Sequence, residues 1–344
     1  MLISGISFFG ALFTYKKTVL LYPICKQKTG VVYMAPSQKR RKNMERELFY
    51  EKMKEALMEL KPDEMEITFM RVDKQNRMGL HGCTLSMPDA AAAPTFYLED
   101  LYEAYLNGTA VEDIAEGVIE FAKENNRAVI PNGIDVVNYE SARKHLGLMI
   151  IGAEENREYL ETLVHEIIEG LALVPIVFID DDHSTGCIKI KKELLMVWGV
   201  TAHEVMEEAK QNSARVMPPT FKLMSDIFKE NSDLDLDDLC VPEEAELFVV
   251  SNRYFVCGAS VAFYPGFLES IGMALGTDFY ILPSSINELI LLRDLGQNPL
   301  ELLQIVKTVN RTQLQPEEIL ADAVYYFSRS GGFRKILPME AVLV

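Results

Sequence analysis

One pattern recurs along this chain: two apolar runs joined by a short polar turn, and then a run whose apolar residues fall three or four positions apart. Short apolar runs bounded by turn residues predict strands, and the wider spacing predicts helices. The clearest copy has DFYIL and ELILL on either side of PSSIN, followed by PLELLQIVKTVN with Pro299 in the first helical turn. The pattern predicts an α+β fold of repeated antiparallel β-hairpin-plus-helix units, with mixed sheets backed by helices.

Three other stretches have the same order. EITFMRV and LHGCTLSM flank DKQNRMG, LVPIVFI and CIKIK flank DDDHSTG, and ELFVV and ASVAFY flank SNRYFVCG. The predicted helices that follow them include VEDIAEGVIEFAKEN, TAHEVMEEAKQN with Thr201 as N-cap, and PGFLESIGMALG. The copies share order and not residues, so we infer no duplication. LVPIVFI is apolar throughout, which is typical of a strand buried on both faces.

The first 43 residues differ from the rest, because they hold eight Lys or Arg and no Asp or Glu. One explanation is a basic arm. A second is a signal or membrane anchor, but the apolar run 2–15 is shorter than the roughly 20 residues that a membrane span needs. We favour a third explanation, which is that translation starts at Met44. The basic stretch QKRRKN lies directly before Met44, and the purine-rich DNA of a bacterial ribosome-binding site would translate into such Lys and Arg codons. Met44 opens a helix predicted to end at Lys61-Pro62.

The expected organisation has five segments. They are a non-native or disordered extension (1–43), a helix with the first unit (44–126), a second unit with a preceding helix (127–228), an acidic linker or loop (229–244) and C-terminal hairpin-helix units (245–344).

Charge and cysteine content narrow the classes of function. The net charge of −17 opposes binding to phosphate backbones or anionic lipid, so we expect neither a nucleic-acid nor a membrane partner. The five cysteines are scattered, with no C-x-x-C pair, which is typical of reduced thiols in a cytosol. We therefore expect a cytoplasmic protein.

The stretch His165-Glu166-Ile167-Ile168-Glu169 resembles half of a zinc protease motif, on a helix predicted over about 154–170. Such a site needs two ligands at i and i+4 on one helix face and a third from elsewhere. The same H-E-x-x-E spelling recurs at 203–207, so a Glu-rich helical chain produces it easily. We predict that neither copy binds zinc, and we expect no cofactor and no catalytic residue.

Two acidic stretches have plain explanations. DLDLDDLCVPEE places carboxylates at calcium-loop positions, but position 6 is Asp238 where an EF-hand needs Gly. DDDHSTG (180–186) is rich in residues that form hairpin turns. We interpret the first as a solvated linker and the second as a turn.

The PSSIN loop is the candidate binding site. Ser284 and Ser285 join two very apolar strands, and Asn310, Arg311 and Thr312 end the helix that follows. If the fold brings these residues together, they form a small polar site for an anion or a peptide backbone. The alternative is an ordinary turn and an ordinary helix end.

Four blocks in the same order resemble a known family. They are PTFYLEDLYEAYLNG, VWGVTAHEVMEEAKQN, LGTDFYILPSSINELILL and VNRTQLQPEEILADAVYYF. Together they resemble the bacterial, mostly Firmicutes family called domain of unknown function 5688 over most of 44–344. The resemblance implies a bacterial cytoplasmic protein and carries no catalytic residue with it.

These observations favour a binding, adaptor or regulatory protein without catalytic activity, whose partner is another protein. The alternatives are a metal-dependent hydrolase that uses His165 and Glu166, and an acidic protein that occupies a DNA-binding partner.

Overall fold

The computed structural model describes residues 45–88, 90, 93–126, 133–180, 185–230 and 246–337. The predicted start at Met44, the extension before it, most of the acidic segment 229–244 and residues 181–184 of the second turn lie outside these ranges. The chain divides into two compact units, an N-terminal unit that ends at Ile134 and a C-terminal unit that begins at Asp135. Each is described by itself.

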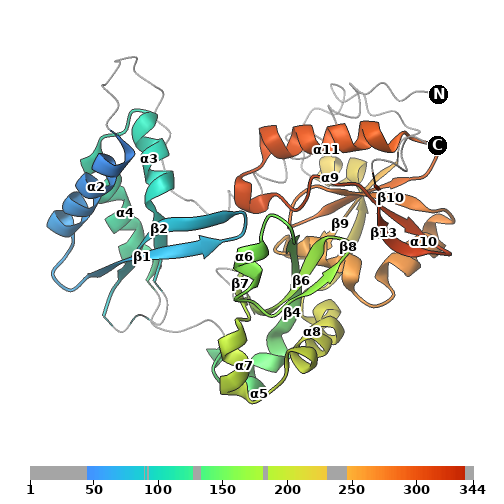
Figure 1. Ribbon diagram of the computed structural model, residues 1–344, viewed down its shortest axis with the longest axis horizontal. Helices are drawn as coiled ribbons and strands as arrows, with labels where there is room; N and C mark the ends of the chain where they lie inside the picture. The colour runs from blue at the N-terminus through green and yellow to red at the C-terminus, as the bar shows by residue number, and fades with distance from the viewer. Residues whose placement is uncertain are drawn as a thin grey trace. The chain divides into compact units, whose positions relative to one another are not determined.

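The N-terminal unit is a three-stranded antiparallel sheet covered on one face by helices (Figure 1). Its elements, in chain order, are α2 (Arg46–Leu60), β1 (Glu66–Lys74), β2 (Arg77–Ser86), β3 (Thr95–Tyr97), α3 (Leu98–Leu106) and α4 (Val111–Asn125). The strands follow one another in order in the sheet. The first hairpin and the helices predicted around it are therefore confirmed, including the end of α2 at Lys61. Gly108, after α3, has the left-handed backbone that often follows a helix.

The core of the N-terminal unit lies between α2, α4 and one face of the sheet. Side chains with no exposed surface include Phe49, Met53 and Leu57, which recur at helical spacing on α2. They pack with Cys83 and Leu85, which are two positions apart on β2 and so share one face.

The C-terminal unit contains a four-stranded sheet centred on β6 (Leu171–Asp180). β4 (Leu146–Gly152) pairs along one edge of β6, while β5 (Glu166–Ile168) and β7 (Thr185–Lys189) pair with opposite ends of the other edge. The first eight residues of β6 are buried, as the apolar run predicts. The helical segments of this part are α5 (Tyr139–Ala142), η2 (Arg143–His145), α6 (Arg157–Leu160), α7 (Lys192–Trp198) and α8 (Ala202–Val216).

A six-stranded antiparallel sheet forms the rest of the C-terminal unit, in the order β13-β12-β10-β11-β9-β8. Its strands are β8 (Pro219–Leu223), β9 (Leu247–Asn252), β10 (Phe279–Pro283), β11 (Leu289–Arg293), β12 (Tyr325–Ser328) and β13 (Gly332–Lys335). The accompanying helices are α9 (Met224–Glu230), η4 (Gly258–Phe263), α10 (Phe267–Leu275), α11 (Pro299–Gln313) and η5 (Pro316–Glu318).

Two helices cover opposite faces of this sheet. On α11, Leu302, Val306 and Val309 pack against the face that carries Tyr280 and Leu282 (Figure 1). Phe279 and Phe327 pair on the other face, where α10 brings Gly272 so close that a Cβ there would lie 3.2 Å from the Phe327 ring. The hairpin β10–β11, the helix α11 and the N-capping of α8 by Thr201 are confirmed. The α+β class is confirmed. Every described strand pair is antiparallel, whereas the sequence pattern predicted mixed sheets.

Two predicted elements are wrong. The helix expected over 154–170 is replaced by the four-residue α6, the strand β5 and a tight turn into β6. Glu169 and Gly170 both have left-handed backbones, with φ of 52° and 81°, and such a two-residue turn directs β5 back along β6. The strand expected over 259–264 is the 3-10 helix η4, because β9 already pairs with β8 and β11 on its two edges.

No helix among the described residues is long and apolar enough to cross a membrane.

Candidate functional site

The first H-E-x-x-E motif lies on β5 and its turn, so its side chains are not on one helix face. The Nδ1 atom of His165 lies 3.0 Å from the carbonyl oxygen of Leu163. The carboxylate of Glu166 pairs with Lys210 of α8 at 2.8 Å. Glu169 accepts a hydrogen bond from the backbone N–H of Lys335 at 2.8 Å. Each polar side chain of the motif therefore has a structural partner.

The second motif lies on α8, as predicted, and two of its side chains have structural roles. Glu204 completes a capping box, since its carboxylate accepts from the Thr201 N–H at 2.8 Å and its own N–H donates to the Thr201 hydroxyl. Glu207 pairs with Lys210 at 3.0 Å. The described residues contain no group of three or more His, Cys, Asp or Glu side chains that could hold a metal ion. The absence of zinc from both motifs stays a prediction.

The predicted PSSIN site is divided between buried and exposed residues. Ser284, Ser285 and Asn310 are buried, whereas Arg311 and Thr312 are exposed. The hydroxyl of Ser285 accepts the backbone N–H two positions along, a local bond that fixes the turn. Asn310 donates to the carbonyl of Ala321 at 3.1 Å. The described contacts therefore give Ser285 and Asn310 local structural roles.

The PSSIN loop does meet the segment that follows α11, since Ile286 N–H donates to the carbonyl of Glu318 at 3.0 Å. Thr312 donates back into its own helix, to the carbonyl of Thr308. The five residues thus come from neighbouring segments without forming one exposed polar surface. A binding role for them stays a prediction.

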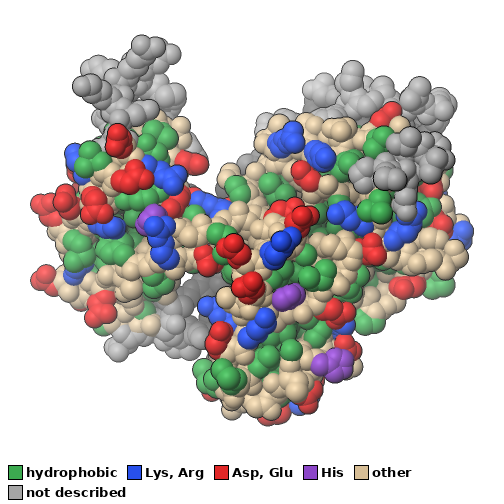
Figure 2. Space-filling model, in the orientation of Figure 1, with side chains coloured by type: hydrophobic (Ala, Val, Ile, Leu, Met, Phe, Trp, Pro, Cys, Tyr) green, Lys and Arg blue, Asp and Glu red, His purple; other side chains and the backbone are tan. Residues whose placement is uncertain are grey.

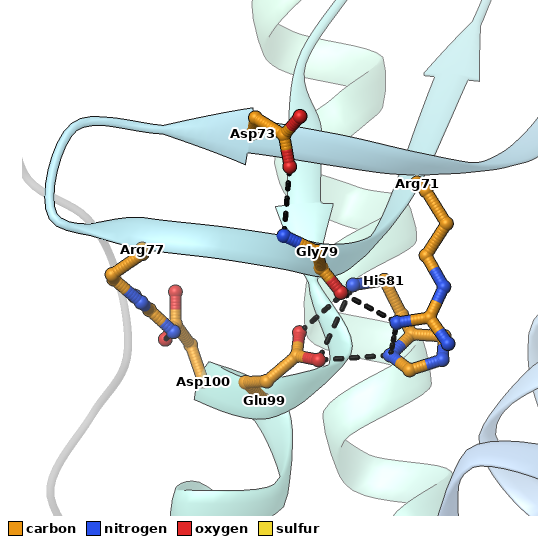
Figure 3. Close-up of polar contacts among 7 residues, drawn as sticks. All are labelled: Arg71, Asp73, Arg77, Gly79, His81, Glu99 and Asp100. Atoms are coloured by element: carbon orange, nitrogen blue, oxygen red, sulfur yellow. Dashed lines mark hydrogen bonds and ion pairs between the residues drawn. The ribbon is translucent and has the colours of Figure 1, made fainter. Parts of the chain in front are cut away.

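A polar cluster in the N-terminal unit has no counterpart among the predicted sites (Figure 3). Glu99, in the first turn of α3, lies 2.9 Å from Nδ1 of His81 on β2 and also accepts the backbone N–H of His81. Arg71 of β1 approaches the same ring nitrogen at 3.3 Å and donates to the carbonyl of Gly79. An ionised carboxylate only accepts hydrogen bonds, so the shorter contact assigns a proton to Nδ1 that faces Glu99.

This arrangement fixes the orientation of the His81 ring. Burial pushes the pKa of Glu99 upward, but hydrogen bonds from the side chain and the backbone of His81 outweigh burial and hold that pKa below its usual value. The Tyr50 ring packs against the imidazole with the ring centroids 4.7 Å apart. The ring therefore packs against Tyr50 of α2 and bonds to Glu99 of α3, so the cluster joins β2 to two helices of the N-terminal unit.

Two of the exposed apolar side chains of the C-terminal unit lie on α7. Met196 and Val197 are 80% and 62% exposed, and Val137 is 63% exposed in the segment held beside this helix. Hydrophobic atoms collect over α7 in Figure 2. We call Val137, Met196 and Val197 the α7 surface. Its backbone is held in place, since the indole of Trp198 donates to the carbonyl of Val136 at 3.0 Å.

No solved structure and no curated protein matches this chain. A family model described as "Family of unknown function (DUF5688)" matches residues 46–329. That range covers most of both units and contains the four sequence blocks that resemble this family. Because the match spans well over half of the chain, the protein belongs to the DUF5688 family.

Proposed function

We propose that the protein is a cytoplasmic bacterial binding or adaptor protein that acts without catalysis, and that the α7 surface binds its partner protein. The observation that carries this proposal is the exposure of Met196, Val197 and Val137 at 80%, 62% and 63% on one short helix and its neighbour. Contiguous exposed apolar side chains on a folded protein are typical of interaction surfaces. Methionine in particular adapts to the shape of a partner.

The α7 surface is held firmly before any partner arrives. Tyr139 packs against the Trp198 ring with centroids 5.3 Å apart, and Lys192 donates to the carbonyl of Glu161 at 2.8 Å. Gly199, with φ of 67°, ends α7 in the left-handed conformation that glycine adopts without strain. A surface that is already ordered loses little conformational entropy on binding.

Charge favours a different protein over a second copy of this chain. A net charge of −17 makes two copies repel each other. Two exposed lysines, Lys191 and Lys192, stand at the start of α7 beside the apolar side chains. We therefore propose a partner with an apolar segment flanked by carboxylates, which would complement both features.

The cytoplasmic location is part of the proposal. It is supported by Cys83, Cys187 and Cys257, which are free thiols among the described residues, as suits a reducing compartment. The two alternative functions have less support. The Glu166 carboxylate that a hydrolase would use beside His165 is paired with the ammonium of Lys210 at 2.8 Å. On the face drawn in Figure 2, basic side chains lie among the acidic ones, unlike the continuous acidic strip of a DNA-like surface.

The test compares two exposed surfaces of the C-terminal unit. The Met196→Ser/Val197→Ser variant removes the α7 surface, and Met273→Ser removes an equally exposed methionine, 75% exposed, from α10. Each protein is used to capture partners from the native host, and the captured protein is then purified and its affinity measured. We expect the double variant to bind that protein at least about tenfold more weakly, since central apolar contacts contribute more than about 1 kcal/mol each.

The Met273→Ser control should bind as the wild type does. Equal capture and equal affinity for all three proteins would contradict the proposal. A self-associated wild type that the double variant converts to a monomer, measured by analytical ultracentrifugation, would reassign the α7 surface to a second copy of this chain.

A further inference from the structure

Two thiols that are distant in the chain meet inside the C-terminal unit. The Sγ atoms of Cys187 and Cys257 lie 3.7 Å apart, although 70 residues separate them. Cys187 lies on β7 of the four-stranded sheet, where it pairs with Phe178 of β6. Cys257 lies between β9 of the six-stranded sheet and η4. The contact therefore joins segments that belong to two different sheets.

The segment that carries Cys257 is held in an unusual conformation. Asn252, which is fully buried, accepts from the N–H of Tyr254 at 3.0 Å and donates to the carbonyl of Val256 at 2.7 Å. Asn287 accepts the N–H of Cys257 at 3.0 Å. Cys257 itself has φ of 54°, a left-handed backbone that costs a non-glycine residue energy and persists only where its surroundings impose it. The fold thus positions this thiol against its partner.

The electrostatic surroundings make the two sulfurs unequal. The Cys257 thiol donates a hydrogen bond to Cys187, and this bond lowers the pKa of Cys187. Burial opposes this effect and the Lys189 ammonium adds to it, and together they place the pKa of Cys187 at about 7. The same hydrogen bond and burial raise the pKa of Cys257 well above its ordinary value. Burial lowers the pKa of Lys189, but Tyr159 and the two sulfurs outweigh burial and raise it, so this lysine stays charged.

Accessibility and charge agree on which sulfur reacts first. Cys187 is half-buried, whereas Cys257 is 3% exposed. Cys83 provides a contrast, because burial raises its pKa to about 12 and among the described cysteines only Cys187 and Cys257 contact each other. A low-pKa thiol on a half-buried residue, beside a second thiol, resembles the arrangement of oxidant-sensitive cysteine pairs.

We propose that Cys187 and Cys257 form an oxidation site at which a hydroperoxide produces a disulfide between β7 and the segment that follows β9. The Cys187 thiolate attacks the peroxide oxygen, the O–O bond breaks, and the alcohol or water leaves after taking a proton, so that Cys187 becomes a sulfenic acid. The Cys257 sulfur then attacks the Cys187 sulfur, the S–O bond breaks, and the thiol proton leaves with the hydroxyl as water. Two thiols are oxidised and one peroxide is reduced.

This site adds to the proposed binding function and does not depend on it. In a reducing cytosol such a disulfide is transient, which is the usual role of a cytosolic pair. It would close a long loop and so restrict the motion of one sheet against the other.

The experiment uses the full-length chain purified in reductant and then treated with one equivalent of hydrogen peroxide. We expect the intact protein to lose the mass of two hydrogen atoms, and non-reducing peptide mapping to recover a linked pair of peptides that contain Cys187 and Cys257. Cys187→Ser should abolish the linked pair. Cys257→Ser should leave a sulfenic acid at Cys187, which dimedone captures. Cys83→Ala is the matched control and should form the same disulfide as the wild type.

The wild-type protein alone suffices to overturn the proposal, so the test does not depend on whether a variant folds. A wild type that keeps both thiols reactive toward iodoacetamide after excess peroxide would contradict it. Recovery of a linked pair that involves Cys83, or dimedone labelling of a cysteine other than Cys187 in the Cys257→Ser variant, would equally reject the assignment.

Discussion

The ammonium of Lys210 on α8 lies 2.8 Å from the carboxylate of Glu166 on β5 and 3.0 Å from that of Glu207 on its own helix. Glu166 belongs to the first H-E-x-x-E motif and Glu207 to the second. One cation thus joins a carboxylate from each motif. The two stretches that resemble a metal site in the sequence form an ionic contact between a strand and a helix.

Replacing Lys210 by Met should lower the free energy of unfolding by at most about 1 kcal/mol, because both carboxylates are more than 40% exposed and water screens the pairs. Lys210→Arg, which keeps the charge, should lose less. Burial lowers the pKa of Lys210, but the two carboxylates outweigh burial and raise that pKa. The contribution of Lys210 to the free energy of unfolding is therefore complete below the unfolded-state pKa of 10.5, and it is lost as the pH rises through the higher folded-state pKa. Urea unfolding at neutral and alkaline pH measures both effects, and equal loss in the Arg variant would contradict the ionic explanation.

His165→Ala should leave the metal content of the purified protein unchanged. The imidazole faces the carbonyl of Leu163 and the neighbouring Glu166 is engaged by Lys210, so neither is arranged around a metal. We expect a loss of about 1 kcal/mol in the free energy of unfolding from the missing hydrogen bond. Elemental analysis of protein prepared without a metal-affinity tag is the measurement. Stoichiometric zinc that disappears with His165→Ala would restore the hydrolase hypothesis.

Glu99→Gln should destabilise the protein at neutral pH, by about 1 kcal/mol after allowance for partial exposure. The pKa of Glu99 is below 4.5 in the folded protein, so the stabilisation is present above the unfolded-state pKa and is lost as pH falls below 4.5. His81 of β2 and Tyr50 of α2 are the groups that face this carboxylate. Denaturant unfolding followed by circular dichroism should show the difference from wild type shrinking with falling pH.

The matched control for that prediction is Asp100→Asn, one residue along α3. Asp100 pairs with Arg77 at 2.7 Å but is 47% exposed, so its loss should change the free energy of unfolding by less than about 0.5 kcal/mol. Equal effects for the two variants at neutral pH would show that the part-buried contact of Glu99 with His81 contributes no more to stability than the exposed pair of Asp100 and Arg77.

The rate of alkylation of Cys187 should rise with pH around neutrality, because neighbouring groups lower the pKa of its thiol. With a pKa of about 7, the thiolate fraction and the initial rate should rise about tenfold between about pH 6 and pH 8. The facing groups are Cys257 on the segment after β9 and Lys189 on the same strand. Site-resolved mass spectrometry with iodoacetamide measures the rate. Cys83, whose pKa burial raises to about 12, should react far more slowly throughout, and a Cys187 rate parallel to that of Cys83 would contradict the prediction.

Gly258→Ala should destabilise the C-terminal unit by about 2 kcal/mol or more. A Cβ at this position would lie 2.1 Å from the Ser251 hydroxyl and 2.3 Å from the carbonyl oxygen of Asn287, and the backbone atom has little freedom to move away. Gly186→Ala, where nothing lies within 4 Å, is the control and should be nearly neutral. Thermal unfolding of both variants tests the difference, and a neutral Gly258→Ala would show that the η4 segment shifts readily.

Some elements follow from local sequence alone. The β10–β11 hairpin has two apolar strands and a short polar turn within 15 residues of chain, so apolar runs and turn residues suffice to predict it. The start of α8 is also local, because Thr201 and Glu204 cap each other's backbone three positions apart. His81 carries a weaker local signal, as a polar residue on the same strand face as the core residues Cys83 and Leu85.

The sequence by itself determined the α+β class, three of the four predicted hairpins and most of the predicted helices, because apolar runs, helical spacing and caps act over a few residues. Only the tertiary structure decided that Ile167 and Ile168 are a strand, since the edge of β6 offers hydrogen bonds that a helix would leave unused. The contact of Cys187 with Cys257 likewise depends on how two sheets pack, across 70 residues of chain. Such long-range contacts leave no periodic trace in the sequence, because their energy comes from residues that are neighbours only after folding.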